Sequence, residues 1–81
     1  MRETVTRAGL SDILTAELQT IEDAAGSRIT VQYELLEPDA DGCNWSDSVS
    51  VRVGPKASPE YLRPIVSDII KRARSRYNIS G

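Results

Sequence analysis

The stretch Arg28-Ile29-Thr30-Val31-Gln32-Tyr33-Glu34-Leu35 alternates polar and apolar residues at every second position. The run Ser48-Val49-Ser50-Val51-Arg52-Val53 repeats this alternation. Because successive side chains of a strand point to opposite faces, each run predicts a strand with one apolar and one polar face. Asp41-Gly42 between the runs is a strong turn signal, so together they predict an antiparallel hairpin with a loop somewhat longer than the minimum.

The residues before the hairpin predict an amphipathic helix from about Asp12 to Ala25. Ser11 can cap its N-terminus, and Gly26 can take the left-handed conformation that closes its C-terminus. Such a helix needs a hydrophobic core to cover its apolar face. That face comprises Leu10, Ile13, Leu14, Leu18, Ile21, Ala24 and Ala25, which recur at helical spacing.

A second amphipathic helix is predicted after the hairpin. Ser58-Pro59 is typical of a capping residue followed by proline in the first helical position, and Asn78 is a stop signal. Pro64 removes a backbone donor inside this helix, so we expect a kink there or a short separate turn from Pro59 to Leu62. The apolar stripe comprises Tyr61, Leu62, Ile65, Val66, Ile69, Ile70, Ala73 and Tyr77.

This order of elements predicts an α+β fold, an α-β-β-α two-layer sandwich with both helices packed on the apolar face of the antiparallel hairpin. The 81 residues, 40% hydrophobic and 27% charged, fit one small globular domain over residues 1–81. Two strands alone make a weak sheet. Either Thr4-Val5-Thr6 adds a third, N-terminal strand, or two copies join edge to edge or face to face. A homodimer is therefore the first partner that we expect.

Composition excludes several classes of protein. The chain has one Cys and no His, so it lacks the residues of an ordinary zinc site and cannot form an internal disulfide. The acidic residues around the hairpin do not have the spacing of a calcium loop, and no phosphate-binding motif is present, so we expect no cofactor. No segment has the apolar length of a signal peptide or membrane span, which predicts a cytoplasmic protein without membrane contact.

The hairpin loop Asp39-Ala40-Asp41-Gly42-Cys43-Asn44-Trp45-Ser46-Asp47 holds the only Cys and the only Trp of the chain. Loops of this kind often carry binding surfaces. Trp45 either closes the end of a small core or stands exposed as an interface anchor. It shares the odd numbering of Val49 and Val51, so core closure is the favoured interpretation, unless a bulge reverses the pattern.

Cys43 has two interpretations, as a buried small residue under the turn or as a thiol nucleophile. The neighbouring aspartates would raise the pKa of the thiol, and the chain has no His to act as a base. The buried structural role is therefore favoured. A thiol-dependent enzyme centred on Cys43 is the weakest of the functional hypotheses.

Charge is divided unequally along the chain. Residues 1–47 hold three Arg and ten Asp or Glu, a balance of −7, whereas residues 48–81 hold seven Lys or Arg and two acids, a balance of +5. We therefore expect a molecule whose charge is distributed unevenly over its surface. Four of the basic residues lie near the end of the second helix, where the helix dipole also favours cations. These are Lys71, Arg72, Arg74 and Arg76.

The sequence favours a small, non-enzymatic protein-interaction domain that binds itself or another protein. The binding residues would be Cys43 and Trp45 of the loop, or Arg28 and Arg52 of the polar sheet face together with the four basic residues of the last helix. The alternative is a nucleic-acid-binding module that uses the same arginines and Lys71. The sequence pI of about 5.0 and the lack of aromatic residues on the polar sheet face weigh against it.

Overall fold

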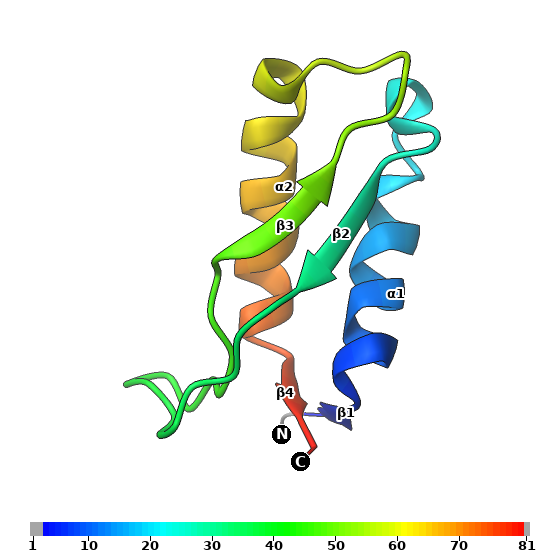
Figure 1. Cartoon of the computed structure of the whole chain (residues 1–81). Coiled ribbons are helices and arrows are strands. Elements are labelled where there is room, and N and C mark those ends of the chain that lie inside the picture. The colour runs from blue at the N-terminus through cyan, green and yellow to red at the C-terminus, as the bar shows by residue number, and fades with distance from the viewer. Residues whose placement is uncertain (1–2, 81) are drawn as a thin grey trace.

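Two helices lie on one side of a two-stranded hairpin in the computed structural model, which describes residues 3–80 (Figure 1). The predicted α+β fold with its two-layer arrangement is confirmed. The elements in chain order are β1 (Glu3–Val5), α1 (Arg7–Leu18), a 3-10 turn η1 (Glu22–Ala24), β2 (Arg28–Val31), β3 (Val49–Arg52), α2 (Pro59–Arg74) and β4 (Tyr77–Ile79).

The hairpin has the predicted antiparallel pairing. Ile29 lies opposite Val51, and Val31 lies opposite Val49. Ile29 and Val31 are buried, whereas Val49 and Val51 are only half-buried on the same face. The first strand was predicted too long, because β2 ends at Val31 and Tyr33 is 58% exposed.

A β-bulge explains why the first strand ends early. Beyond the regular ladder, pairing resumes only at an isolated bridge between Glu34 and Trp45. Residues 46–48 are opposed there by residues 32–33 alone, so one strand carries an extra residue. A bulge interrupts the alternation of faces. The extra residue lies in the segment 46–48 that leads into β3, and Tyr33, which lies opposite this irregular segment, points into solvent.

The first helix begins and ends earlier than the predicted range Asp12–Ala25. The hydroxyl of Thr6 accepts a hydrogen bond from Gly9 N at 3.0 Å, so Thr6 rather than Ser11 caps α1. Ser11 is buried instead. Gly26 has the expected positive φ of 83°, but it follows η1 rather than the end of α1. Helical spacing indicated the correct apolar face but not the ends of the helix.

The second helix begins as predicted, because Ser58 Oγ accepts from Tyr61 N at 3.1 Å and caps it. Pro64 lies on the exposed side of one uninterrupted helix, so the predicted separate turn is wrong. The expected extension to Tyr77 is also wrong. The helix ends at Arg74, and the chain then turns into β4.

The N-terminal strand forms, but it does not join the hairpin. β1 pairs in parallel with β4, with Glu3 opposite Tyr77 and Val5 opposite Ile79. This pairing brings the two ends of the chain together at the bottom of Figure 1. The expectation of a third strand beside the hairpin is therefore wrong, and β2 and β3 form a sheet of their own.

The hydrophobic core lies between the hairpin and the helices and extends to β4. Trp45 is fully buried in it, so its side chain closes the core as predicted. The shared odd numbering was not a valid reason for this prediction, because the bulge lies between Trp45 and Val49. Its indole Nε1 donates to Tyr77 O at 3.0 Å. The other large buried side chains are Leu10, Leu14, Leu18, Ile29, Val31, Leu62, Ile69 and Ile70.

Candidate functional site

The outer edge of β2 is sealed by two hydroxyl groups of α1. Thr15 Oγ1 accepts from Ile29 N at 3.0 Å and donates to Ile29 O at 3.1 Å. Ser11 Oγ accepts from Val31 N at 2.9 Å. Both hydroxyl-bearing residues are buried. The outward-facing Ile29 N, Ile29 O and Val31 N are therefore bonded to the helix and are not open to a further strand.

The outer edge of β3 is open. In an antiparallel pair, two residues opposite each other either bond across the ladder or both point outward. Because the N–H groups of Ile29 and Val31 point away from β3, those of Val49 and Val51 must point away from β2. Within residues 3–80, no strand pairs with this side of β3. The edge therefore presents a row of backbone donors and acceptors.

A groove with a volume of about 1100 Å³ runs along this open edge, between β3 and α2. We call it the edge groove. In Figure 1, α2 lies behind β3, so the helix forms the floor and the strand forms one wall. The surface is apolar along its centre, where two rows of side chains meet. These are Val49, Val51 and Val53 from the strand side, and Leu62, Val66 and Ile70 from the helix.

The hairpin loop closes one end of the edge groove and is tied to α2. Asp39 accepts from the N–H groups of Asp41 at 2.9 Å and Cys43 at 3.1 Å. Arg74 forms an ion pair with Asp39 at 2.6 Å and donates from Nε to Trp45 O at 3.2 Å. The hydrogen bond from the Cys43 amide, with smaller help from the Arg74 charge, lowers the pKa of Asp39 from its ordinary value of 3.8.

Acid is expected to weaken this loop. A carboxyl group whose pKa is lower in the folded chain stabilises the fold above its unfolded pKa. That contribution is lost as pH falls from 3.8 through the lower folded value. Thermal unfolding between about pH 6 and pH 2 should therefore show a steeper acid loss of stability in the parent chain than in Asp39→Asn.

Asp23→Asn is the control for this comparison, because Asp23 is an exposed carboxylate on η1, at the other end of the molecule from the loop (Figure 1). It should retain the acid dependence of the parent chain. If the stability of Asp39→Asn and of the parent fell equally with decreasing pH, the loop would not depend on this carboxylate.

Two asparagines join the loop to β4, and the sequence indicated neither contact, since Asn78 was interpreted only as a helix stop. Asn44 Nδ2 donates to Ile79 O at 2.8 Å, and Asn44 Oδ1 accepts from Ile79 N at 2.8 Å. Asn78 Nδ2 donates back to Gly42 O at 2.9 Å. The Asn44 carboxamide thus acts like one more residue of a β-ladder. No local spacing signals this contact, because its members are more than thirty residues apart in the chain.

Asn44→Ala is expected to lower the free energy of unfolding by about 2 kcal/mol, because two hydrogen bonds worth about 1 kcal/mol each are lost. Asn44→Asp keeps the shape and the acceptor for Ile79 N but sets a carboxylate against Ile79 O, so it should cost at least as much at neutral pH. Urea denaturation followed by circular dichroism measures both. A loss below about 0.5 kcal/mol for Asn44→Ala would contradict the structural role.

The basic residues near the end of α2 do not form one cationic surface. Arg72 pairs with Glu17 at 2.6 Å, and Arg74 is held by the loop. Arg76 lies beyond the helix, with its guanidinium 5.5 Å from the ring of the tyrosine that follows it. Lys71 lines the edge groove. The two ion pairs join the acidic half of the sequence to the basic half, so charge separated along the chain is partly neutralised in space.

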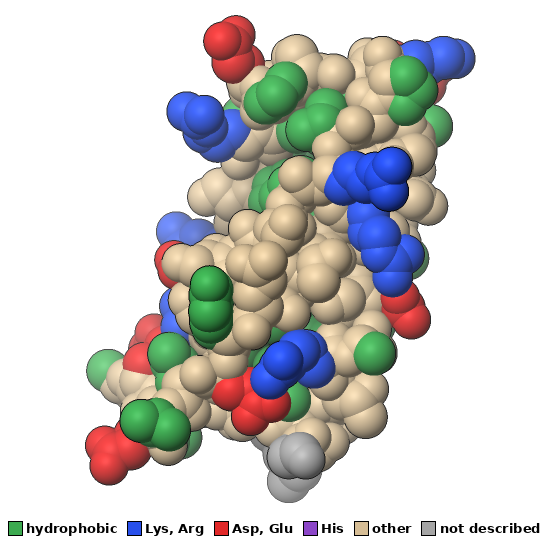
Figure 2. Space-filling model, viewed as in Figure 1, with side chains coloured by type: hydrophobic (Ala, Val, Ile, Leu, Met, Phe, Trp, Pro, Cys, Tyr) green, Lys and Arg blue, Asp and Glu red, His purple; other side chains and the backbone are tan. Residues whose placement is uncertain are grey.

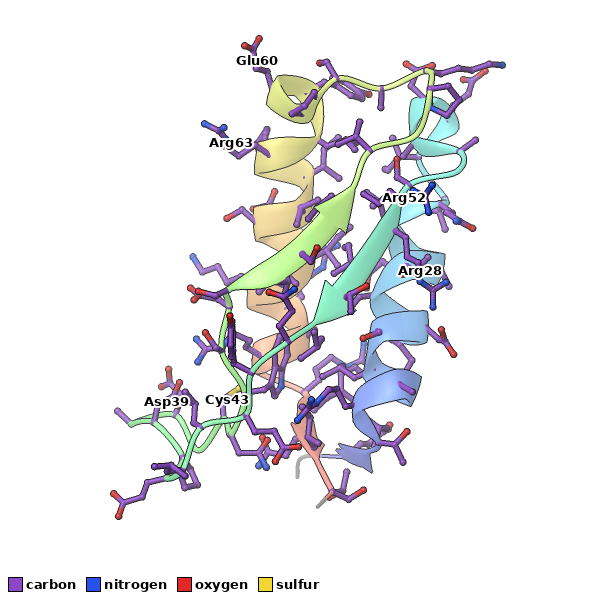
Figure 3. The ribbon with its side chains drawn as sticks, in the orientation of Figure 1. Arg28, Asp39, Cys43, Arg52, Glu60 and Arg63 are labelled. Atoms are coloured by element: carbon purple, nitrogen blue, oxygen red, sulfur yellow. The ribbon has the colours of Figure 1, made fainter. Side chains whose placement is uncertain are left out.

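The polar face of the hairpin carries Arg28 and Arg52, which lie directly opposite each other in the ladder. Both side chains are labelled in Figure 3, and Figure 2 shows basic side chains gathered over this part of the hairpin. Arg28 also pairs with Asp12 at 3.1 Å. Two like charges at neighbouring exposed positions are unfavourable for the sheet, and they make this face locally basic.

The two loop residues proposed for binding are both inside the protein. Cys43 is 1% exposed, and its thiol Sγ donates to Trp45 O at 3.6 Å. Trp45 is fully buried. The sequence-predicted residues therefore fall in three places, which are the core under the loop, the polar sheet face and the end of α2. Three of them, Cys43, Lys71 and Arg74, also line the edge groove, which runs along one of the two hairpin edges where the sequence predicted that copies could join.

Among residues 3–80, no group of three or more Cys, His, Asp or Glu side chains is arranged to hold a metal ion. The helices in this described part are too short or too polar to cross a membrane. In comparisons with known proteins, no family model, curated protein or solved structure matches the chain.

Proposed function

We propose that this chain is a non-enzymatic, cytoplasmic protein-interaction domain that binds its partner in the edge groove. The observation that supports this function is the unpaired edge of β3 beside an apolar groove. An exposed strand edge is a template for another extended chain, and neighbouring apolar side chains supply contact area for it. Cys43 lines the loop end of the groove, and the buried Trp45 holds the loop that closes it.

Two occupants are compatible with this function, a second copy of the chain and a segment of another protein. A homodimer would follow from the thin stability margin of a small domain. Sedimentation across a concentration series measures it directly. Dimerisation that disappears when Val51 is replaced by lysine would assign the dimer contact to the edge groove.

A displayed library of linear peptides tests the proposed function and requires no assumption about the sequence of the partner. We expect the parent protein to enrich peptides whose retention is lost in Val51→Lys, because that change puts a charge on the apolar wall of the groove. Ser50→Lys is the matched control, since Ser50 lies on the exposed polar face of the same strand. Enrichment unaffected by Val51→Lys, or no enrichment together with no self-association, would contradict the proposal.

Nucleic-acid binding is the alternative, and the paired Arg28 and Arg52 are the observation in its favour. Basic side chains on one exposed face can neutralise phosphates and release counterions. The test is retention on a nucleic-acid column at low salt, with the double change Arg28→Gln and Arg52→Gln as the comparison. Flow-through of the parent protein at low salt would remove this alternative.

A further inference from the structure

We infer that the edge groove takes an extended segment of a different protein, added antiparallel to β3, with apolar residues at every second position and a basic residue at the end nearest the hairpin loop. This inference rests on the proposed function. It specifies the chemistry of the partner. Three features determine this chemistry, namely the open edge, the width of the helix layer and the charges at the groove ends.

The open edge sets the alternation. The N–H and C=O groups of Val49 and Val51 point into the groove, so an antiparallel segment exchanges hydrogen bonds with those residues. Side chains of directly opposed residues lie on the same face of a sheet. Partner residues opposite Val49 and Val51 therefore lie over Leu62, Val66 and Ile70 and must be apolar. The residues between them point to solvent and must be polar.

The helix layer disfavours a second folded copy at this edge. Paired strands lie about 4.8 Å apart, whereas packed helices need about 8–10 Å between their axes. α2 lies behind β3 and lines the same groove (Figure 1). A second copy that paired its β3 with this one would bring its own α2 too close to the first. A segment without a helix beneath it meets no such obstacle.

The groove ends set the charge pattern. At the loop end, the groove is lined by three acidic and two basic side chains, an excess of one negative charge, and these are Asp39, Asp41 and Asp47 against Lys71 and Arg74. Arg63 lines the other end and extends from α2 on the side away from α1 (Figure 3). Because β3 begins at the loop, an antiparallel partner strand has its C-terminal end at the loop. Its C-terminal end should carry Lys or Arg, and its N-terminal end Asp or Glu.

A labelled synthetic peptide tests this inference. Valine alternates with threonine in its central part, a glutamate precedes that part, and a lysine follows it. Fluorescence anisotropy should show binding to the parent chain. Exchanging the glutamate and the lysine should weaken binding several-fold. N-methylation of the valines removes the donors that face β3 and should weaken it at least about tenfold.

Matched variants of the protein locate the contact. Val51→Pro removes the N–H that faces the groove but no ladder bond to β2, so the hairpin can still form. Val51→Ala shortens the same side chain and keeps the N–H. We expect Val51→Pro to bind the peptide about tenfold more weakly than Val51→Ala does. The N-methylated peptide gives the same information with the unchanged protein, whatever the stability of Val51→Pro.

The remaining outcomes separate the inference from the function on which it rests. Equal binding of the peptide and its N-methylated form would overturn strand addition. Absence of peptide binding, together with dimerisation that Val51→Pro abolishes, would overturn the inferred partner and retain the protein-interaction function. Absence of peptide binding, of dimerisation and of library enrichment would overturn both.

Discussion

Trp45→Ala is expected to lower the free energy of unfolding by about 3–5 kcal/mol, because it empties the space of the largest fully buried side chain. The change also removes the hydrogen bond from Nε1 to Tyr77 O and the ring beside the Arg74 guanidinium, whose centre is 6.0 Å away. A domain of this size has a total stability of roughly 4–12 kcal/mol. The substitution should therefore remove a large part of it.

Urea denaturation followed by circular dichroism measures this loss, since the fluorescent side chain itself is removed. Trp45→Phe is the matched variant, because it keeps an aromatic ring in the core but leaves Tyr77 O without the indole donor. It should cost about 1–3 kcal/mol, less than the alanine variant. A stability for Trp45→Ala within about 1 kcal/mol of the parent would mean that Trp45 does not close the core.

Gly54→Ala is expected to cost about 3 kcal/mol for a different reason, which is steric. A Cβ atom at Gly54 would overlap Ala25 O and lie 3.1 Å from Gly26 C. These are backbone atoms and cannot rotate away. The close approach is held by Gly54 N, which donates to the buried Ser27 Oγ at 2.8 Å. An added methyl group must push the segment after β3 away from the segment before β2.

Gly9→Ala is the control for this effect. A Cβ atom at Gly9 would meet only the side-chain oxygen of Thr6, at 3.0 Å. Gly9 lies inside α1, where alanine is intrinsically better than glycine by about 1 kcal/mol. The net change should be within about 1 kcal/mol. If Gly54→Ala and Gly9→Ala had the same stability, the crossing at Gly54 would not be as tight as the structure has it.

The sequence predicted the parts of the fold that local physics determines. Alternation placed Ile29 and Val31 on the buried face, and Ser58 capped the second helix as expected. Helical spacing indicated the apolar face of α1 but not its ends, because Thr6 and Ser11 are equally good capping residues in sequence. Which of them caps depends on Val31, whose amide requires the Ser11 hydroxyl inside the fold.

The rest depends on contacts between distant residues. β1 and β4 lie at opposite ends of the chain, and their short segments carry no signal of their pairing. The charge imbalance between the two halves predicted a lopsided surface, yet Glu17 pairs with Arg72 across the fold. Alternation also predicts nothing about which hairpin edge is covered. Only the position of α1 beside β2 shows that the open edge belongs to β3.

The two edges of the hairpin differ because α1 covers β2 and no strand of residues 3–80 pairs with the outer side of β3, and residue-resolved amide hydrogen exchange in dilute protein measures this difference. Ile29 and Val51 lie opposite each other in one ladder, with Ile29 buried and Val51 half-buried, and only the amide of Ile29 has a helix hydroxyl as its outward partner. We predict slow exchange at Ile29 and Val31, whose amides bond to the hydroxyls of α1, and fast exchange at Val49 and Val51. Exchange at Val51 as slow as at Ile29 would mean that the outer edge of β3 is protected and not open.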